Sequence, residues 1–105
     1  MELKGEFDLE QMTAAADKAC ALMKTLGHKG RLMVLCQLAS GEKSVGELAA
    51  SLHIPQSPLS QHLARMRKEG LVKTRREAQT VYYSLKAEEA GKIIECLYML
   101  YCAPD

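Results

Sequence analysis

Four cysteines, at positions 20, 36, 96 and 102, carry the most reactive side chains of this 105-residue chain. None is spaced as Cys-x-x-Cys, so the sequence contains neither a zinc ribbon nor a thioredoxin-like motif. The acidic start MELKGEFDLE does not resemble a secretory signal, and no stretch approaches the ~18 consecutive apolar residues of a membrane span. We therefore expect a cytoplasmic protein with no membrane partner, whose cysteines are reduced thiols rather than disulfides.

Cys36 and Cys102 fall in two predicted helices that flank a polar and basic segment. Within that segment, residues 57–69 are predicted to form a helix with an apolar face for the core. The opposite face is small and polar, with cations at its far end. Such a face suits a recognition helix in the major groove of DNA, where short side chains allow close approach and amides, hydroxyls and guanidinium groups contact bases and phosphates. The predicted core residues are Leu59, Leu63 and Met66, and the predicted DNA contacts are Gln56, Ser57, Ser60, Gln61, Arg65 and Lys68.

A basic β-hairpin is predicted directly after this helix. Residues 71–76 and 80–85 are rich in Val, Thr and Tyr, as strands are, and residues 77–79 form the turn between them. A basic hairpin in this position would act as a wing over residues 71–85 that contacts phosphates or the minor groove. The alternative is a solvated edge hairpin whose charges prevent aggregation. The predicted wing contacts are Arg75, Arg76, Gln79 and Thr80.

Charge is distributed unevenly along the chain, although the formal net charge is only +1. Residues 56–80 carry six cations against two carboxylates, a net charge of +4. Residues 1–20 carry two cations against five carboxylates, a net charge of −3. A basic stretch in a nearly neutral protein is the electrostatic footprint expected for a polyanion such as DNA. A solvated, charged helix face is the alternative explanation.

Apolar spacing predicts the helices at either end of the chain. Residues 8–26 form an amphipathic helix that Asp8 caps and Gly27 ends. Residues 29–39 are apolar nearly all round, so this helix should be central and buried. The last helix covers about 87–102. It has two apolar faces, one at Ile93, Leu97 and Leu100 and the other at Ile94, Tyr98 and Tyr101.

Capping residues predict two further helix starts in the middle of the chain. Ser44 and Glu47 form a capping box that opens a short helix to about His53. Ser57 is expected as the N-cap of the next helix, with Pro58 as its first helical residue. The order is four helices, two strands and a helix. This is a mainly α winged helix-turn-helix fold of five helices with a two-stranded hairpin, in one domain over residues 1–105.

The stretch SVGELAASLHIPQSPLSQHLARMRKEGLVKTRREAQTVYYSL resembles the core of the ArsR/SmtB family of bacterial winged-helix repressors. The resemblance implies a homodimer that pairs through the first and last helices, 8–26 and 87–102. It also implies binding to imperfect palindromes in double-stranded operator DNA. The two apolar faces of the last helix fit this arrangement, because one can pack on its own core and the other on a partner. A small aliphatic core, with one Phe and no Trp, often gains stability by dimerising.

The metal sites of this family are not matched. One type uses Cys-x-Cys in the third helix, and here that helix reads SVGELAA; another uses a histidine on the last helix, which here has none. His28, His53 and His62 are scattered, and helix ends or packing explain each, with His62 expected to be half-buried. We therefore expect no metal site and no cofactor. A thiolate site for a soft metal or arsenic(III) stays open as an alternative.

The positions of Cys36 and Cys102 instead resemble the paired thiols of the SqrR/BigR-type persulfide sensors and of HlyU-type virulence regulators. That resemblance implies that the two thiols meet within one subunit, where reactive sulfur species join them by a di-, tri- or tetrasulfide bridge and the dimer releases its operator. The alternative is that Cys36 is an inert core residue, since it shares a helix face with Leu32 and Leu35. Cys20 and Cys96 do not match the reactive positions and are interpreted as small hydrophobic residues.

The sequence thus predicts a homodimeric transcriptional repressor that senses persulfides through Cys36 and Cys102. Three alternatives remain within regulation: a metal- or arsenic-responsive repressor, a repressor switched by general oxidants, and a virulence regulator of the HlyU type. An enzyme such as a sulfurtransferase is not expected, because there is no Gly-rich loop around a cysteine, no obvious base and too short a chain for a substrate cleft.

Overall fold

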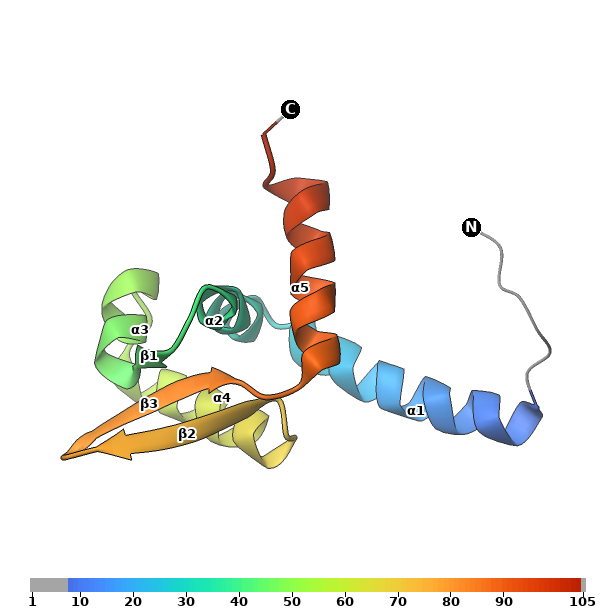
Figure 1. Cartoon of the computed structure of the whole chain (residues 1–105), viewed down its shortest axis with the longest axis horizontal. Helices are drawn as coiled ribbons and strands as arrows, with labels where there is room; N and C mark the ends of the chain where they lie inside the picture. The colour runs from blue at the N-terminus through green and yellow to red at the C-terminus, as the bar shows by residue number, and fades with distance from the viewer. Residues whose placement is uncertain (1–7, 105) are drawn as a thin grey trace.

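The structure is a computed structural model that describes residues 8–104, and these residues form five helices and three strands (Figure 1). The predicted order of four helices, a hairpin and a final helix is confirmed, and strand β1 is an addition that the sequence pattern did not indicate. The elements are α1 (Leu9–Leu26), α2 (Lys29–Ala39), β1 (Lys43–Ser44), α3 (Val45–Leu52), α4 (Gln56–Lys68), β2 (Val72–Glu77), β3 (Thr80–Leu85) and α5 (Glu88–Tyr101).

Most helix ends follow the predicted capping residues. The Asp8 carboxylate accepts from the Glu10 amide at the start of α1, and the Gly27 amide donates to the Met23 carbonyl at its end. At the start of α3, the Glu47 amide donates to Ser44 Oγ at 3.1 Å and the Ser44 amide to the Glu47 carboxylate at 2.9 Å. This reciprocal pair satisfies two amides that a helix leaves without partners.

Helix α4 begins earlier than predicted. Pro55 is its N-cap residue and Gln56 its first helical residue, so the prediction of Ser57 as N-cap and Pro58 as first residue is wrong. The first hydrogen bond of the helix runs from the Leu59 amide to the Pro55 carbonyl at 3.1 Å. Pro58 is tolerated inside the first turn because the amides there have no partner within the helix. The helix predicted over 57–69 is therefore shifted by one residue at both ends.

The sheet is antiparallel, with β3 between β1 and β2. Strands β2 and β3 pair from Val72 opposite Leu85 to Glu77 opposite Thr80, so the turn is the two residues 78–79 and not 77–79. β1 adds only Lys43 and Ser44 to the far edge of β3. This short pairing connects the loop after α2 to the hairpin.

The core is aliphatic, as predicted from the composition. The core faces of α2, α3 and α4 meet there, and β2 and α5 close it. α2 is central but is not buried all round, because Met33, Cys36 and Ala39 on its outer face are exposed. The buried core residues are Val34, Leu35, Leu38, Leu48, Leu59, Leu63, Met66, Leu71, Val72, Ala90 and Ile94.

Helices α1 and α5 project from this core in two directions (Figure 1). The first half of α5 packs inward through Ile94, whereas Leu100 and Tyr101 near its end are 68% and 81% exposed. The apolar side chains predicted to form two faces of α5 therefore also differ along the helix. Those in its first half pack toward the core, and those near its end are exposed. Leu9, at the far end of α1, is 73% exposed. No helix in the described part of the chain is long and apolar enough to cross a membrane.

Candidate DNA-binding and thiol sites

The outer face of α4 is polar and open to solvent. Leu59, Leu63 and Met66 are fully buried on its inner face, as predicted. The opposite side chains are exposed, and those of the first two turns line a shallow depression. This surface can approach another molecule closely, because the serines and the alanine that line it have short side chains. The residues of the depression are Gln56, Ser57, Ser60, Gln61 and Ala64.

The last turn of α4 carries the cations Arg65, Arg67 and Lys68. Their charge complements the partial negative charge at a helix C-terminus. Arg65 lies 3.6 Å from the Glu69 carboxylate, one turn further on. Because the Arg65 side chain is half exposed, this ion pair contributes little to stability and leaves the guanidinium accessible.

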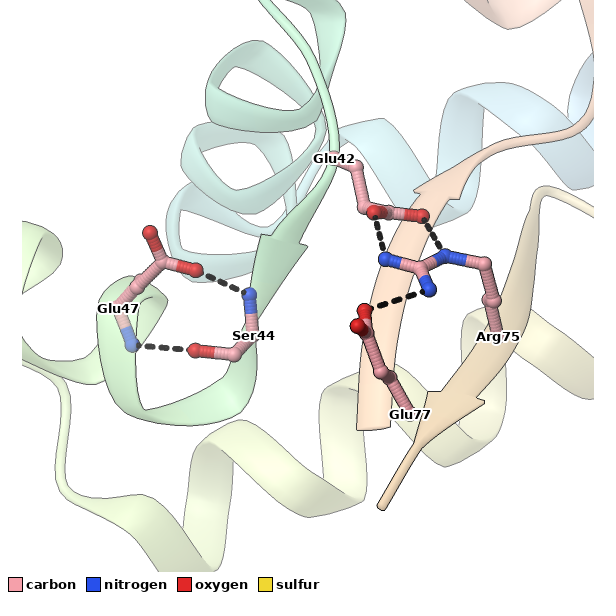
Figure 2. A network of polar contacts seen from close by, with 5 residues as sticks. All are labelled: Glu42, Ser44, Glu47, Arg75 and Glu77. Atoms are coloured by element: carbon pink, nitrogen blue, oxygen red, sulfur yellow. Dashed lines mark hydrogen bonds and ion pairs between the residues drawn. The ribbon is translucent and has the colours of Figure 1, made fainter. Parts of the chain in front are cut away.

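The hairpin presents two different kinds of side chain. Arg76, Gln79 and Thr80 are exposed at or near its tip. Arg75, one residue before Arg76, is held by the protein itself (Figure 2). Its guanidinium donates to both carboxylate oxygens of Glu42 at 2.7 and 3.1 Å, and to Glu77 at 2.9 Å.

These contacts shift the pKa values of Glu42 and Arg75 in opposite directions. The hydrogen bonds from Arg75 lower the pKa of Glu42, and the hydrogen bonds to Glu42 and Glu77 raise the pKa of Arg75. The guanidinium also lies over the ring of Tyr82, 4.8 Å from its centroid. The sequence did not indicate this cluster, although the register that pairs Arg75 with Tyr82 follows once the two-residue turn is known.

His28 and His62 lie together between α2 and α4. Their ring centroids are 4.6 Å apart, and His28 Nδ1 accepts from the Gly30 amide at the start of α2. Burial, the neighbouring His28 and the cations Arg31 and Arg65 lower the pKa of His62. His62 is half-buried, as predicted, and serves as a packing residue between the two helices.

Cys36 and Cys102 line the same cavity. The cavity lies between α2 and α5, has a volume of about 1000 Å³ and is mainly apolar. Both thiols are exposed and unbonded, so Cys36 is not a core residue of the described chain. Partial burial raises the pKa of Cys36, and the nearby Cys102 raises it further.

The other two cysteines are also exposed but stand elsewhere. Cys20 lies on α1 and Cys96 on α5, and neither lines the cavity. In the described part of the chain, no three His, Cys, Asp or Glu side chains gather in a way that could hold a metal ion.

Helices α3 and α4, followed by a hairpin, form a winged helix-turn-helix fold, with a polar helix face and a hairpin tip on the surface. Residues 28–74 match the family described as bacterial regulatory protein, arsR family. The chain belongs to this ArsR family. It is therefore a regulatory protein and not an enzyme, as the sequence predicted.

Named relatives extend this match over nearly the whole chain. The biofilm growth-associated repressor of Agrobacterium fabrum is 48% identical over 101 residues, which are 96% of this chain and 86% of the relative. The transcriptional activator HlyU of Vibrio cholerae is also 48% identical over 101 residues, 95% of this chain and 94% of the relative.

Solved structures of relatives share the fold. Reduced HlyU from Vibrio cholerae matches with a TM-score of 0.86 at 48% identity, over 90% of this chain and 100% of the other. The homodimeric winged helix-turn-helix DNA-binding domain Mb0332 from Mycobacterium bovis matches with a TM-score of 0.75 at 26% identity, over 93% and 89%.

Proposed function

We propose that this chain is a homodimeric, single-domain transcriptional repressor that releases operator DNA when a persulfide bridges Cys36 to Cys102. α4 is its recognition helix, the β2–β3 hairpin its wing, and α1 and α5 its pairing helices. The proposed DNA contacts are the predicted side chains of α4 and, on the hairpin, Arg76, Gln79 and Thr80. Relatives that are named both repressor and activator support a role in transcription.

The observation that carries the dithiol switch is the shared cavity of Cys36 and Cys102. Two accessible thiols in one cavity can react in sequence with one sulfur donor. A bridge of several sulfur atoms spans separations that a plain disulfide cannot reach without backbone movement.

The bridge forms in two steps that conserve atoms and electrons. The thiolate of Cys102 first attacks the outer sulfur of a hydropersulfide RS–SH, which yields a Cys102 persulfide and RS⁻, protonated to RSH. The thiolate of Cys36 then attacks Cys102 Sγ and expels HS⁻. The two thiols lose two electrons and the donated sulfur gains them, so the products are the bridge, RSH and H₂S. Each further persulfide that reacts before closure lengthens the Cys102 persulfide by one sulfur atom and releases one more RSH. Cys36 then attacks the sulfur next to the terminal one, so the added sulfur atoms stay in the bridge and HS⁻ leaves.

The raised pKa of Cys36 supports this order of attack. Thiolates and not thiols are the nucleophiles, and a raised pKa keeps Cys36 mainly protonated near neutral pH. We therefore assign the first attack to Cys102, whose side chain is exposed at the C-terminal end of α5. Cys36 acts second, when the reactive sulfur is already held beside it.

Exposed apolar side chains on α1 and α5 support the homodimer. Leu9, Tyr98 and Leu100 are each more than half exposed, and they lie on the two helices that project from the core. A second copy of the chain would bury these side chains. The homodimeric state of the Mycobacterium bovis domain Mb0332 is consistent with this assembly.

The test uses a DNA duplex selected from a random-sequence pool by the reduced protein. Separate samples receive glutathione persulfide, hydrogen peroxide, zinc or arsenite, and intact mass and DNA affinity are measured on each. We expect persulfide alone to link Cys36 to Cys102, either as a disulfide or with one or more whole sulfur atoms gained, and to release the DNA. Sedimentation of the DNA-free protein should report a dimer.

Cysteine variants provide the controls. Cys36→Ser and Cys102→Ser should bind the duplex and keep it after persulfide treatment. Cys96→Ser is the matched control, because Cys96 is exposed on α5 outside the cavity, and it should respond as wild type does. Release by Cys36→Ser would contradict the dithiol switch. Equal bridging by peroxide would indicate a general oxidant sensor, and release by zinc or arsenite without a bridge would indicate a metal-responsive repressor.

A further inference from the structure

Arg75 connects the hairpin to the segment that follows α2. Glu42 stands between the end of α2 at Ala39 and strand β1, and its carboxylate accepts two hydrogen bonds from Arg75 (Figure 2). A bidentate pair of this kind fixes the direction as well as the distance between two groups. It therefore constrains the hairpin relative to the segment after α2, in addition to the backbone pairing of β1 with β3.

The Arg75 side chain also contacts the neighbouring strand of the sheet. Arg75 pairs in register with Tyr82 on β3, and Tyr82 pairs with Ser44 on β1, so the three residues form one row across the sheet. The guanidinium lies over the Tyr82 ring and reaches Glu42 beyond it. On the other side, Glu77 occupies a third donor. Arg75 is thus held by three residues, Glu42 on the loop, Glu77 on β2 and Tyr82 on β3.

This arrangement engages three of the five N–H donors of the Arg75 side chain. Two carboxylates offset the charge of Arg75, so a DNA phosphate would be attracted less strongly to Arg75 than to an arginine with no acidic partner. Arg76 differs, because it is exposed on the same strand and no ion pair to it is found among the described residues. The two neighbouring arginines therefore have different contacts, although the sequence predicted the same role for both.

We infer that Arg75 is a positioning residue, which Glu42 holds so that the wing meets DNA at a defined angle, whereas Arg76 supplies a phosphate contact. This inference rests on the proposed DNA binding through the hairpin. It assigns a role in recognition to Glu42, an acidic residue that would otherwise only repel DNA.

The salt dependence of DNA affinity distinguishes a positioning role from a phosphate contact. Loss of one phosphate contact lowers the slope of log affinity against log salt by about 1. Arg76→Gln, the matched control on the next residue, should lower the slope by this amount. Arg75→Gln and Glu42→Gln should each weaken binding to the selected duplex by about tenfold, the order expected for residues in one ion-pair network, with an unchanged slope.

A double-mutant cycle tests the pairing itself. The variant with both Glu42→Gln and Arg75→Gln should bind no more weakly than either single variant, since each single change already breaks the contact. The reversed pair, Glu42→Arg with Arg75→Glu, should bind more tightly than Arg75→Glu alone. Far-UV circular dichroism and thermal unfolding of each variant show whether the fold is retained.

The opposite pattern would overturn the inference. If Arg75→Gln lowers the salt slope by about 1 while Glu42→Gln leaves binding unchanged or tighter, Arg75 is a phosphate contact and Glu42 is merely repulsive. Failure of the reversed pair to recover any affinity would also contradict it. Absence of DNA binding by the wild-type protein is a separate result, which would reject the proposed function itself.

Discussion

At the scale of single residues, Cys36 combines accessibility with a suppressed reactivity. It is exposed at the wall of the cavity, yet partial burial and the neighbouring Cys102 raise the pKa of its thiol. Both effects disfavour the thiolate, so Cys36 remains mainly a thiol at neutral pH. A thiol of this kind resists random oxidation but can close a bridge once Cys102 holds the reactive sulfur.

The rate of Cys36 alkylation by iodoacetamide should therefore rise with pH beyond the ordinary range of a free cysteine. Only the thiolate reacts, and a raised pKa moves the half-maximal rate to higher pH. In Cys102→Ser the half-maximal pH should fall, because one cause of the shift is removed, while burial keeps it above the ordinary value. Site-resolved mass spectrometry measures both profiles. A half-maximal pH below that of a free cysteine would contradict this environment.

The sequence predicted the pairing of the two thiols but not the contacts of Arg75. Cys36 and Cys102 could be paired through the resemblance to dithiol sensors, because residue type and position carry that signal. The partners of Arg75 could not be predicted in this way. Glu42 lies 33 residues earlier in the chain, and only the pairing of β1 with β3 brings it close. A local pattern of cations looks the same whether its charges are free or offset.

At the scale of elements, α1 and α4 are joined at their C-terminal ends. The hydroxyl of Thr25, a fully buried residue on α1, lies 2.8 and 2.9 Å from the two Glu69 carboxylate oxygens at the end of α4. Arg31 donates to the carbonyls of Thr25 and Lys24, so it caps α1 from the start of α2. The proposed recognition helix thus has a polar connection to a proposed pairing helix.

Thr25→Val should lower the free energy of unfolding by about 1–2 kcal/mol. The change keeps the shape of the side chain but removes a buried hydrogen bond to a charged group, and partial exposure of Glu69 limits the cost. Thr13→Val is the matched control on α1, because its hydroxyl is exposed and donates only to the Leu9 carbonyl. Urea unfolding measures both. Equal effects of the two changes would show that the Thr25–Glu69 contact adds no stability.

Elements were predicted best where capping residues act locally. Asp8 and the Ser44–Glu47 box were identified because each satisfies amides within three residues of itself. The start of α4 was misplaced because Ser57-Pro58 carries the same local signal without making the cap. Strand β1 was missed because its two residues become a strand only by pairing with Tyr82 and Tyr83.

At the scale of the whole molecule, the described chain is elongated, with extents of 50 × 36 × 21 Å. This shape arises because α1 and α5 project from a small core and carry exposed apolar side chains. Cys102 and the exposed apolar side chains of α5 lie at the outer end of that helix. A bridge to Cys36 would therefore constrain the proposed pairing helix against α2, which also contacts α4. The proposed sensor and the proposed DNA surface share these packed helices.

Coupling between the thiol bridge and DNA binding has a thermodynamic consequence, whichever structural contacts transmit it. If closing the bridge lowers operator affinity, then operator binding must favour the open dithiol by the same free energy. For a two-electron couple, each tenfold change in affinity corresponds to about 30 mV. A protein whose disulfide form binds the selected duplex tenfold more weakly should therefore show a reduction potential about 30 mV higher when saturated with that duplex. Glutathione redox buffers, followed by acid trapping and intact mass, measure the bridged fraction with and without DNA.

A duplex of scrambled sequence is the control, since DNA that does not discriminate between the two forms cannot shift the equilibrium. It should leave the potential of the Cys36–Cys102 couple unchanged. If the selected duplex also left the potential unchanged while the affinity difference persisted, the two measurements would violate reciprocity for this couple. The loss of affinity would then arise from a different modification, such as one at the exposed Cys20 or Cys96, and not from the bridge.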